Sequence, residues 1–384
     1  DKKKDGIYFT PSTTIYRNLK LLEPFINNIK DVLEPSCGSC EYILKLNNMN
    51  PNLNITGIEL NKTIYESIKK LETNNIELIN TNYLSYEPDK KYDLIIGNPP
   101  YFIMKKPAVD KSYHDYFDGR PNIFILFIIK SLNLLKERGI LSYVLPKNFL
   151  NCLYYDKTRK YIIKNFTILD IVECEEQNFI DTKQETVIII IQCSVGNNDN
   201  YSINISEYHI LGTKSNIVTF KELLKNSKSL EGLGFIVRVG SVVWNECKKE
   251  LTDDSNETML IYSSDVSDNK LSIKQYKNKD KKNYIKREGN TEPILVINRG
   301  YGVGNYKLNF TIINEKDKKQ YLIENHLIII KYGANLSREN MIIKYKELIT
   351  SLNNKKTLEF IEKYFSNNAM NTTELCKILP IYDH

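Results

Sequence analysis

The first half of the chain alternates short β-rich runs with helical patterns, and this alternation restricts the possible folds more than any other feature. Runs rich in Val, Ile and Leu predict strands, and apolar residues at helical spacing predict helices between them. The predicted strands are 30–33, 54–58, 76–79, 92–96, 140–145, 167–173 and 186–192, and the predicted helices are 41–46, 63–72 and 122–135. Strands joined by helices need crossover connections, so we expect an α/β fold with a Rossmann-like, mostly parallel sheet.

A second domain is expected because the pattern changes after Gln192. The chain has 384 residues, which is long for one core. Residues 196–200, Gly-Asn-Asn-Asp-Asn, predict a loop or linker, and beyond them come short strands and turns without crossover units. We therefore expect one domain over 1–195 and a second, mixed α+β domain over 196–384.

Composition excludes some classes of protein and leaves others open. No apolar run reaches the roughly 18 residues of a membrane span, and no secretory signal is visible. Seven scattered cysteines fit a reducing compartment, so we expect a cytoplasmic protein without a membrane partner. Cys37 and Cys40 form a CxxC pair, but no second pair completes a zinc site, and we expect no metal.

The charge of the chain permits a polyanionic partner without requiring one. The formal net charge is only +6, and abundant Lys, Asn and Ile also reflect AT-rich codons. Residues 268–290 are the most basic stretch, which favours either a solvated face or a nucleic-acid contact. Its cationic residues are Lys270, Lys274, Lys277, Lys279, Lys281, Lys282, Lys286 and Arg287.

Unusual residues gather where the predicted strands end. They include residues 34–38, Glu59, Asn82 and residues 98–101. Ligands of parallel sheets bind at the carboxyl ends of strands, and an acidic residue after the second strand is placed to accept ribose hydroxyls. Gly38 permits close approach of its backbone to a ligand. These positions predict a nucleoside-binding site.

The tetrapeptide Asn98-Pro99-Pro100-Tyr101 suggests a particular chemistry. An exocyclic amine of a base is a poor nucleophile, because its lone pair is delocalised into the ring. The side-chain oxygen of Asn98 and the carbonyl of Pro99 could accept its two N–H groups and localise that pair. Tyr101 offers a ring for base stacking, worth about 1–3 kcal/mol. A Pro-rich turn after a buried strand would also produce this sequence, so that alternative stays open.

In their order along the chain, these motifs resemble the gamma class of amino-methyltransferases, in particular the TaqI-type adenine-N6 DNA methyltransferases of restriction–modification systems. The motifs are Thr10-Pro11, Glu34-Pro35-Ser36-Cys37-Gly38, Glu59 and Asn98-Pro99-Pro100-Tyr101. The resemblance implies site-specific transfer of a methyl group from S-adenosylmethionine to N6 of a flipped-out adenine in double-stranded DNA. It implies a catalytic role for Asn98, Pro99 and Tyr101, and no metal.

The same resemblance implies roles for further residues. Thr10 and Pro11 would lie over the methionine end of the cofactor, and Glu34, Ser36 and Gly38 would form the cofactor loop. Glu59 would hold the ribose, and Leu60 and Tyr83 would pack against the adenine of the cofactor. Asn82 stands where the family usually has Asp; we expect its oxygen to accept the bond from that adenine's amino group, with weaker binding. Phe179 would face Tyr101 across the flipped base.

The second half resembles the target-recognition domains of these enzymes, at residues 240–245 and at a closing helix within 371–380. The resemblance further implies a monomer that acts separately from any cognate restriction endonuclease, in a bacterium or, if virus-encoded, inside the host cell. Two alternatives stay open. One is an RNA or protein-glutamine methyltransferase with the same turn, and the other is a catalytically silent DNA-binding relative.

Overall fold

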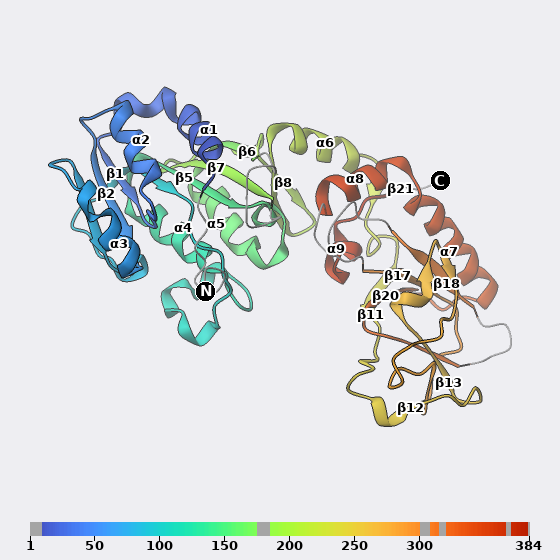
Figure 1. Cartoon of the computed structure of the whole chain (residues 1–384). Coiled ribbons are helices and arrows are strands. Elements are labelled where there is room, and N and C mark those ends of the chain that lie inside the picture. Colours follow the sequence, from blue (N-terminus) through green and yellow to red (C-terminus); the bar gives the residue numbers. More distant parts are fainter. Residues whose placement is uncertain (1–9, 175–184, 300–307, 315–319, 366–369, 383–384) are drawn as a thin grey trace. The chain divides into compact units, whose positions relative to one another are not determined.

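The computed structural model describes residues 10–174, 185–299, 308–314, 320–365 and 370–382. Phe179 lies outside these ranges. The chain divides into two compact units, Asp1–Val218 and Thr219–His384 (Figure 1). Each unit has its own sheets and its own apolar core.

The first unit is built on a seven-stranded sheet with the order β3-β2-β1-β4-β5-β7-β6. Neighbouring strands from β3 to β5 are parallel, whereas β7 runs antiparallel between β5 and β6. The strands are β1 (Asp31–Glu34), β2 (Asn54–Glu59), β3 (Ile76–Asn80), β4 (Tyr92–Gly97), β5 (Leu135–Pro146), β6 (Thr167–Glu173) and β7 (Thr186–Gln192). The predicted strands and the mostly parallel sheet are thus confirmed.

Helices cover both faces of this sheet. The helices of the unit are α1 (Ser12–Leu22), α2 (Glu41–Met49), α3 (Lys62–Ile68), α4 (Ile123–Leu134) and α5 (Asp156–Asn165). Apolar residues of α4 and α5 pack with one set of sheet residues, and those of α1, α2 and α3 pack with another. The three predicted helices are present, but α3 ends at Ile68 and continues as a 3₁₀ turn, Lys69–Leu71.

The stretch 196–200 is not a free linker. Asn198 is 4 % exposed, and its side chain accepts a hydrogen bond from Ile168 N and donates to the carbonyls of Ile163 and Phe166. The following hairpin of β8 (Ser202–Ile205) and β9 (Tyr208–Leu211) packs against α5. The division of the chain therefore falls after Val218, later than the expected boundary near residue 195. The roles assigned to the two domains stay predictions.

The second unit is mixed α+β, as expected. It contains two four-stranded sheets, with the orders β11-β20-β17-β18 and β12-β16-β13-β19. Their strands are β11 (Phe235–Val239), β12 (Leu251–Thr252), β13 (Thr258–Ile261), β16 (Tyr284–Ile285), β17 (Ile294–Asn298), β18 (Phe310–Ile313), β19 (Tyr321–Ile323) and β20 (Leu327–Tyr332). Two-stranded pairs are β10 (Ser227–Lys228) with β21 (Ile381–Tyr382), and β14 (Val266–Ser267) with β15 (Lys270–Leu271).

The remaining helices are α6 (Lys214–Leu224), α7 (Arg338–Leu352), α8 (Lys355–Phe365) and α9 (Thr372–Lys377). The predicted cap of the last helix is present: Asn371 accepts from Glu374 N at 2.8 Å, and Glu374 accepts from Asn371 N at 3.3 Å. Within the described ranges, no helix has both the length and the apolar character that a membrane crossing demands.

Candidate functional site

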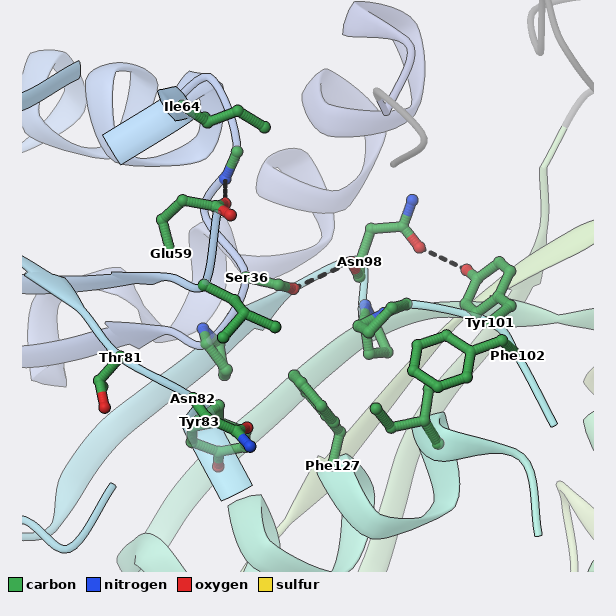
Figure 2. A pocket seen from close by; sticks show the side chains of 16 residues that line it. Ser36, Glu59, Ile64, Thr81, Asn82, Tyr83, Asn98, Tyr101, Phe102 and Phe127 are labelled. Atoms are coloured by element: carbon green, nitrogen blue, oxygen red, sulfur yellow. Dashed lines mark hydrogen bonds between the residues drawn. The ribbon is translucent and has the colours of Figure 1, made fainter. Parts of the chain in front are cut away.

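The carboxyl ends of β1, β2 and β4 place most of the predicted site residues around one pocket (Figure 2). This follows from the parallel order of the three strands, whose carboxyl ends share one edge of the sheet. The pocket is lined by Pro35, Ser36, Gly38, Glu59, Leu60, Ile64, Thr81, Asn82, Tyr83, Asn98, Pro99, Pro100, Tyr101, Phe102, Ile123 and Phe127.

A smaller hollow adjoins this pocket and shares Ser36, Gly38 and Asn98 with it. Thr10 and Glu34 line only the smaller hollow, whereas Pro11 lines neither and instead precedes α1 at its N-cap. The predicted residues within the described ranges thus gather around two adjoining cavities, apart from Pro11.

Glu59 is held rigidly at the end of β2. Its two carboxylate oxygens accept hydrogen bonds from the backbone N–H groups of Gly38, at 3.0 Å, and Asn61, at 2.7 Å. Each oxygen keeps a second lone pair, so the carboxylate can still accept bonds from a ligand. Gly38 has φ +49°, a left-handed conformation that glycine adopts without strain, and this brings its N–H to Glu59.

Glu34 carries a polar atom without a protein partner. The residue is 3 % exposed, and its Oε2 atom has no hydrogen bond among the described residues. Burial, together with the neighbouring Cys40 and Glu59, holds the pKa of the Glu34 carboxyl well above its usual range. A cationic group in the smaller hollow would satisfy this carboxylate and lower its pKa.

Asn98 has three hydrogen-bonded neighbours. Its Nδ2 donates to Thr10 Oγ1 at 3.1 Å, and its Oδ1 accepts from the Tyr101 hydroxyl. The Ser36 hydroxyl donates to the backbone carbonyl of Asn98 at 3.1 Å. Figure 2 shows the Asn98 carboxamide beside the pocket, with its oxygen toward Tyr101. The side chain is therefore not turned away into the protein interior.

Tyr101 is fixed by both its hydroxyl and its ring. The one hydroxyl proton is shared between Asn98 Oδ1 and the carbonyl of Val144, which lies 2.8 Å from the hydroxyl oxygen, and the ring meets Phe124 edge-on, with 6.0 Å between centroids. Burial raises the pKa of the Tyr101 phenol well above its usual range, so this group stays protonated and neutral at ordinary pH. Tyr101 can therefore donate hydrogen bonds and offer its ring, but cannot serve as a base.

Apolar residues of α3 and α4 complete the pocket, and the sequence analysis did not identify them. They are Ile64, Ile123 and Phe127. The Phe127 ring lies 4.8 Å from that of Tyr83, whose hydroxyl is hydrogen-bonded to Ser131. Since nearly every residue of α4 is buried, its hydrophobic pattern gave no signal for which residues face a ligand.

The CxxC pair belongs to the core. Cys37 and Cys40 are buried, and a hydrogen bond between their side chains, together with burial, raises the pKa of the Cys37 thiol. Raised pKa values disfavour the thiolate that metals and redox reactions need. Throughout the described ranges, no three His, Cys, Asp or Glu side chains come together as a metal site.

The basic stretch 268–290 is partly neutralised within the second unit. Arg287 makes a two-pronged ion pair with Glu250, at 2.5 and 2.6 Å, and Lys282 pairs with Asp253 at 2.5 Å. Its other lysines include Lys274, Lys277 and Lys279, which are exposed. The net positive surface is therefore smaller than the sequence suggested.

The chain is similar to several known proteins. The family model described as Eco57I restriction-modification methylase matches residues 13–179. Modification methylase CviBIII of Paramecium bursaria Chlorella virus NC1A is 27% identical, over 99% of this chain and 94% of its own. Type II methyltransferase M.CvrRI of Paramecium bursaria Chlorella virus XZ-6E is 26% identical, over 86% and 84%. Among solved structures, the M protein of the type I restriction enzyme EcoKI is similar with a TM-score of 0.38 and 17% identity, over 49% of this chain and 44% of that chain.

The first unit has the Rossmann-like, mostly parallel sheet that the sequence predicts. The family description and the relatives' names are those of methylases, and the sequence resemblance implies S-adenosylmethionine as their methyl donor. The pocket suits this donor, because it combines an apolar wall with the Glu59 carboxylate, and the adjoining hollow is lined by Glu34, whose Oε2 atom has no partner among the described residues. A nucleoside fits the first part, and the ammonium group of the methionine portion fits the second.

Proposed function

We propose that this protein is a site-specific DNA methyltransferase that transfers a methyl group from S-adenosylmethionine to N6 of a flipped-out adenine in double-stranded DNA. It would then be a gamma-class enzyme of the TaqI type. The observation that carries this proposal is the position of the Asn-Pro-Pro-Tyr turn, since Asn98, Pro99 and Tyr101 line the same pocket as Glu59.

The cofactor would be held by residues from three strand ends and the segment before α1. They are Thr10, Pro11, Glu34, Ser36, Gly38, Glu59, Leu60, Asn82 and Tyr83. When bound, S-adenosylmethionine supplies an electrophilic methyl group on a sulfonium. Glu59 accepts hydrogen bonds from the ribose, and the Glu34 carboxylate pairs with the ammonium group. Leu60, Ile64 and Phe127 exclude water from the faces of the base.

Asn98 and Pro99 would activate the target amine. The Oδ1 atom of Asn98 has two lone pairs, one of which receives the Tyr101 hydroxyl. The second can accept one N–H of the amine, and the Pro99 carbonyl can accept the other. These two bonds draw the nitrogen lone pair out of conjugation. No base is needed before attack, because the nitrogen loses its proton readily once methylated.

Tyr101 would serve as a stacking surface for the extruded base. Flipping a base out of a duplex costs a few kcal/mol, and stacking on an aromatic ring offsets about 1–3 kcal/mol of it. The hydrogen bond to Val144 and the edge contact with Phe124 hold the ring in one position, so little conformational entropy is lost on binding. Phe179 is proposed for the opposite face of the base.

Double-stranded DNA is proposed as the substrate because the matching family is described as a restriction-modification methylase. The relatives that match 99% and 86% of the chain are named as a modification methylase and a Type II methyltransferase. The second unit would then supply target recognition, with lysines on phosphates and polar side chains in the major groove. A monomer that works apart from any cognate endonuclease, in the cytoplasm of a bacterium or of a virus-infected cell, belongs to the same proposal.

The test is methyl incorporation from labelled S-adenosylmethionine into duplex DNA, followed by modification-aware sequencing to identify base, atom and site. Asn98→Ala should lower the rate by at least about a hundredfold, because it removes a preorganised acceptor of the transition state. Asn52→Ala, at an exposed position before β2, is the matched control and should keep the wild-type rate. Near-normal incorporation by Asn98→Ala would refute the proposed activation, and incorporation into RNA or protein alone would refute the substrate.

A further inference from the structure

Asn82 uses both of its oxygens inside its own turn. The residue follows β3 and precedes the 3₁₀ turn Tyr83–Ser85. Its side-chain Oδ1 accepts from Leu84 N at 3.0 Å, and its backbone carbonyl accepts from Ser85 N at 2.9 Å. Such a turn is the ordinary way in which an Asn side chain satisfies the first N–H groups of a tight turn.

This bonding fixes which end of the carboxamide faces the pocket. A backbone N–H can only donate, so the Asn82 side chain must present its oxygen to Leu84. The amino group, Nδ2, takes no part in this turn, and Asn82 lines the pocket beside Tyr83 (Figure 2). The Asn82 oxygen keeps one lone pair, but it is directed at the turn by its bond from Leu84 N, so the amino group is the end of the carboxamide turned away from the turn.

The surroundings of Asn82 indicate which part of a nucleoside it would meet. Glu59, at the end of β2, marks the ribose, because acidic residues at this place accept ribose hydroxyls in dinucleotide-binding sheets. The apolar wall of Leu60, Ile64 and Phe127 suits the faces of a purine. Asn82 follows β3, the strand beside β2, so it stands where the edge of that purine would lie.

We propose that Asn82 presents a hydrogen-bond donor to the purine edge, so that this pocket does not select for a 6-amino group on the base of its cofactor. The inference rests on the proposed function only in placing the nucleoside in this pocket. A 6-amino group is itself a donor and gains no bond from Asn82 Nδ2, whereas a 6-oxo group or a ring nitrogen can accept from it.

An aspartate at this position would replace the hydrogen-bond donor that faces the pocket with an acceptor, and it would keep the turn. A carboxylate offers two oxygens, so one can still accept from Leu84 N while the second faces the pocket. The second oxygen accepts a bond from a 6-amino group and repels a 6-oxo group. Asn82→Asp therefore tests whether residue 82 donates or accepts a hydrogen bond at the purine edge, and it should not disturb folding.

The experiment is titration calorimetry with S-adenosylhomocysteine and S-inosylhomocysteine, which carry a 6-amino and a 6-oxo purine. The wild type should bind the two compounds within about threefold of each other, because one neutral hydrogen bond changes affinity little. In Asn82→Asp, the preference for the adenosyl compound should rise by at least about tenfold, since bonds to a charged acceptor are stronger. Ser85→Asp is the matched control: it adds the same charge on the same turn outside the pocket lining and should leave the ratio at its wild-type value.

Two results would overturn the inference. One is a wild type that prefers the adenosyl compound by about thirtyfold or more, which would require an acceptor at the purine edge. The other is an unchanged ratio in Asn82→Asp, with a thermal unfolding curve like that of the wild type. Binding needs no DNA, so a protein that shows the expected ratios and methylates no DNA refutes only the proposed function. If the wild type binds neither compound, the pocket assignment and this inference both fail.

Discussion

The side-chain oxygen of Asn98 accepts a hydrogen bond from the hydroxyl of Tyr101, so the two ends of the Asn-Pro-Pro-Tyr turn are tied to each other. Thr10 accepts from the amide nitrogen of the same carboxamide at 3.1 Å. These two partners orient the carboxamide, which otherwise could rotate and present its nitrogen in place of its oxygen. The orientation that amine activation requires is thus supported from both sides.

Two substitutions of Tyr101 should separate its two roles, which are to orient the Asn98 carboxamide and to stack on the extruded base. Tyr101→Phe keeps the ring but loses the bond to Asn98, so kcat should fall about threefold to tenfold while KM for DNA stays within about twofold. Tyr101→Ala also removes the stacking surface and should raise KM for DNA about tenfold or more. Steady-state kinetics on a short duplex would measure both. A change of KM in Tyr101→Phe, with kcat unaltered, would contradict the orienting role of the hydroxyl.

The buried Glu34 carboxyl predicts a stability that depends on pH. Its folded-state pKa is raised, so its contribution to stability is complete below the unfolded pKa, about 4.3, and is lost as pH rises toward the folded pKa. Gln does not ionise, so Glu34→Gln should not lose stability in this way as pH rises. The melting temperature of the variant should therefore exceed that of the wild type by a margin that grows from pH 4 upward.

Thermal unfolding of both proteins across pH 4–9 would measure that margin. Glu66→Gln, at an exposed position of α3, is the matched control and should show no such trend. The same Glu34→Gln variant should bind S-adenosylmethionine more weakly in calorimetry, because the ammonium group loses its charged partner. A margin that is constant across the pH range would rule out the proposed titration of Glu34.

Much of the fold and site could be predicted because the relevant signals are local. Each strand of the first sheet contains Val, Ile or Leu in a short apolar run, and Glu34, Glu59 and Asn98 fall at or just past the end of such a run. The positions of Ile123 and Phe127 could not be predicted, because α4 is apolar on all sides and its orientation depends on packing against the sheet. Local sequence therefore locates polar site residues better than it locates apolar walls.

The local sequence also could not show which acidic residue forms an ion pair with each basic residue. The run of basic residues predicts a cationic face, but Glu250 and Asp253 lie 37 and 29 positions before their partners, Arg287 and Lys282. Asn82 shows the same limit on a smaller scale. Its residue type differs from the Asp of the family that the chain resembles, while the direction of its carboxamide depends on the turn that follows it.

The salt dependence of DNA binding should distinguish the exposed lysines from the paired ones. A joint change of Lys274, Lys277 and Lys279 to Ala should weaken binding and reduce the slope of log K against log salt by about one to three. Lys282→Ala should reduce it less, because Lys282 already pairs with Asp253 at 2.5 Å. Fluorescence anisotropy of a labelled duplex at several salt concentrations measures these slopes. If the slope fell by the same amount per lysine in the two variants, the ion pair with Asp253 would not prevent Lys282 from binding DNA.

Gly240 should tolerate no side chain. A Cβ atom there would lie 2.1 Å from the carbonyl oxygen of Glu324 and 2.5 Å from that of Ile323, and neither backbone atom can move freely. Gly240→Ala should lower the free energy of unfolding of the second unit by about 3 kcal/mol or more. Gly232→Ala is the matched control, because its nearest neighbour would be Ser229 Oγ at 3.4 Å. Denaturant unfolding followed by the fluorescence of Trp244 reports on this unit, and equal stability of the two variants would contradict the predicted clash.

Asn198 should be one of the most sensitive polar positions of the first unit outside the pocket. Its carboxamide bonds Ile168 N at 2.7 Å and the carbonyls of Phe166 at 2.9 Å and Ile163 at 3.0 Å, all around the start of β6. Asn198→Ala leaves these buried backbone groups without partners, so the free energy of unfolding should fall by about 2–4 kcal/mol. Asn197→Ala, at the exposed neighbouring position, removes only a bond to Asp199 N and should change it by less than about 1 kcal/mol. Urea unfolding followed by circular dichroism would compare the two. If both substitutions left the free energy of unfolding unchanged, the prediction would be wrong. Residues 196–200 would then behave as a simple linker, which makes no buried hydrogen bonds that a substitution could break.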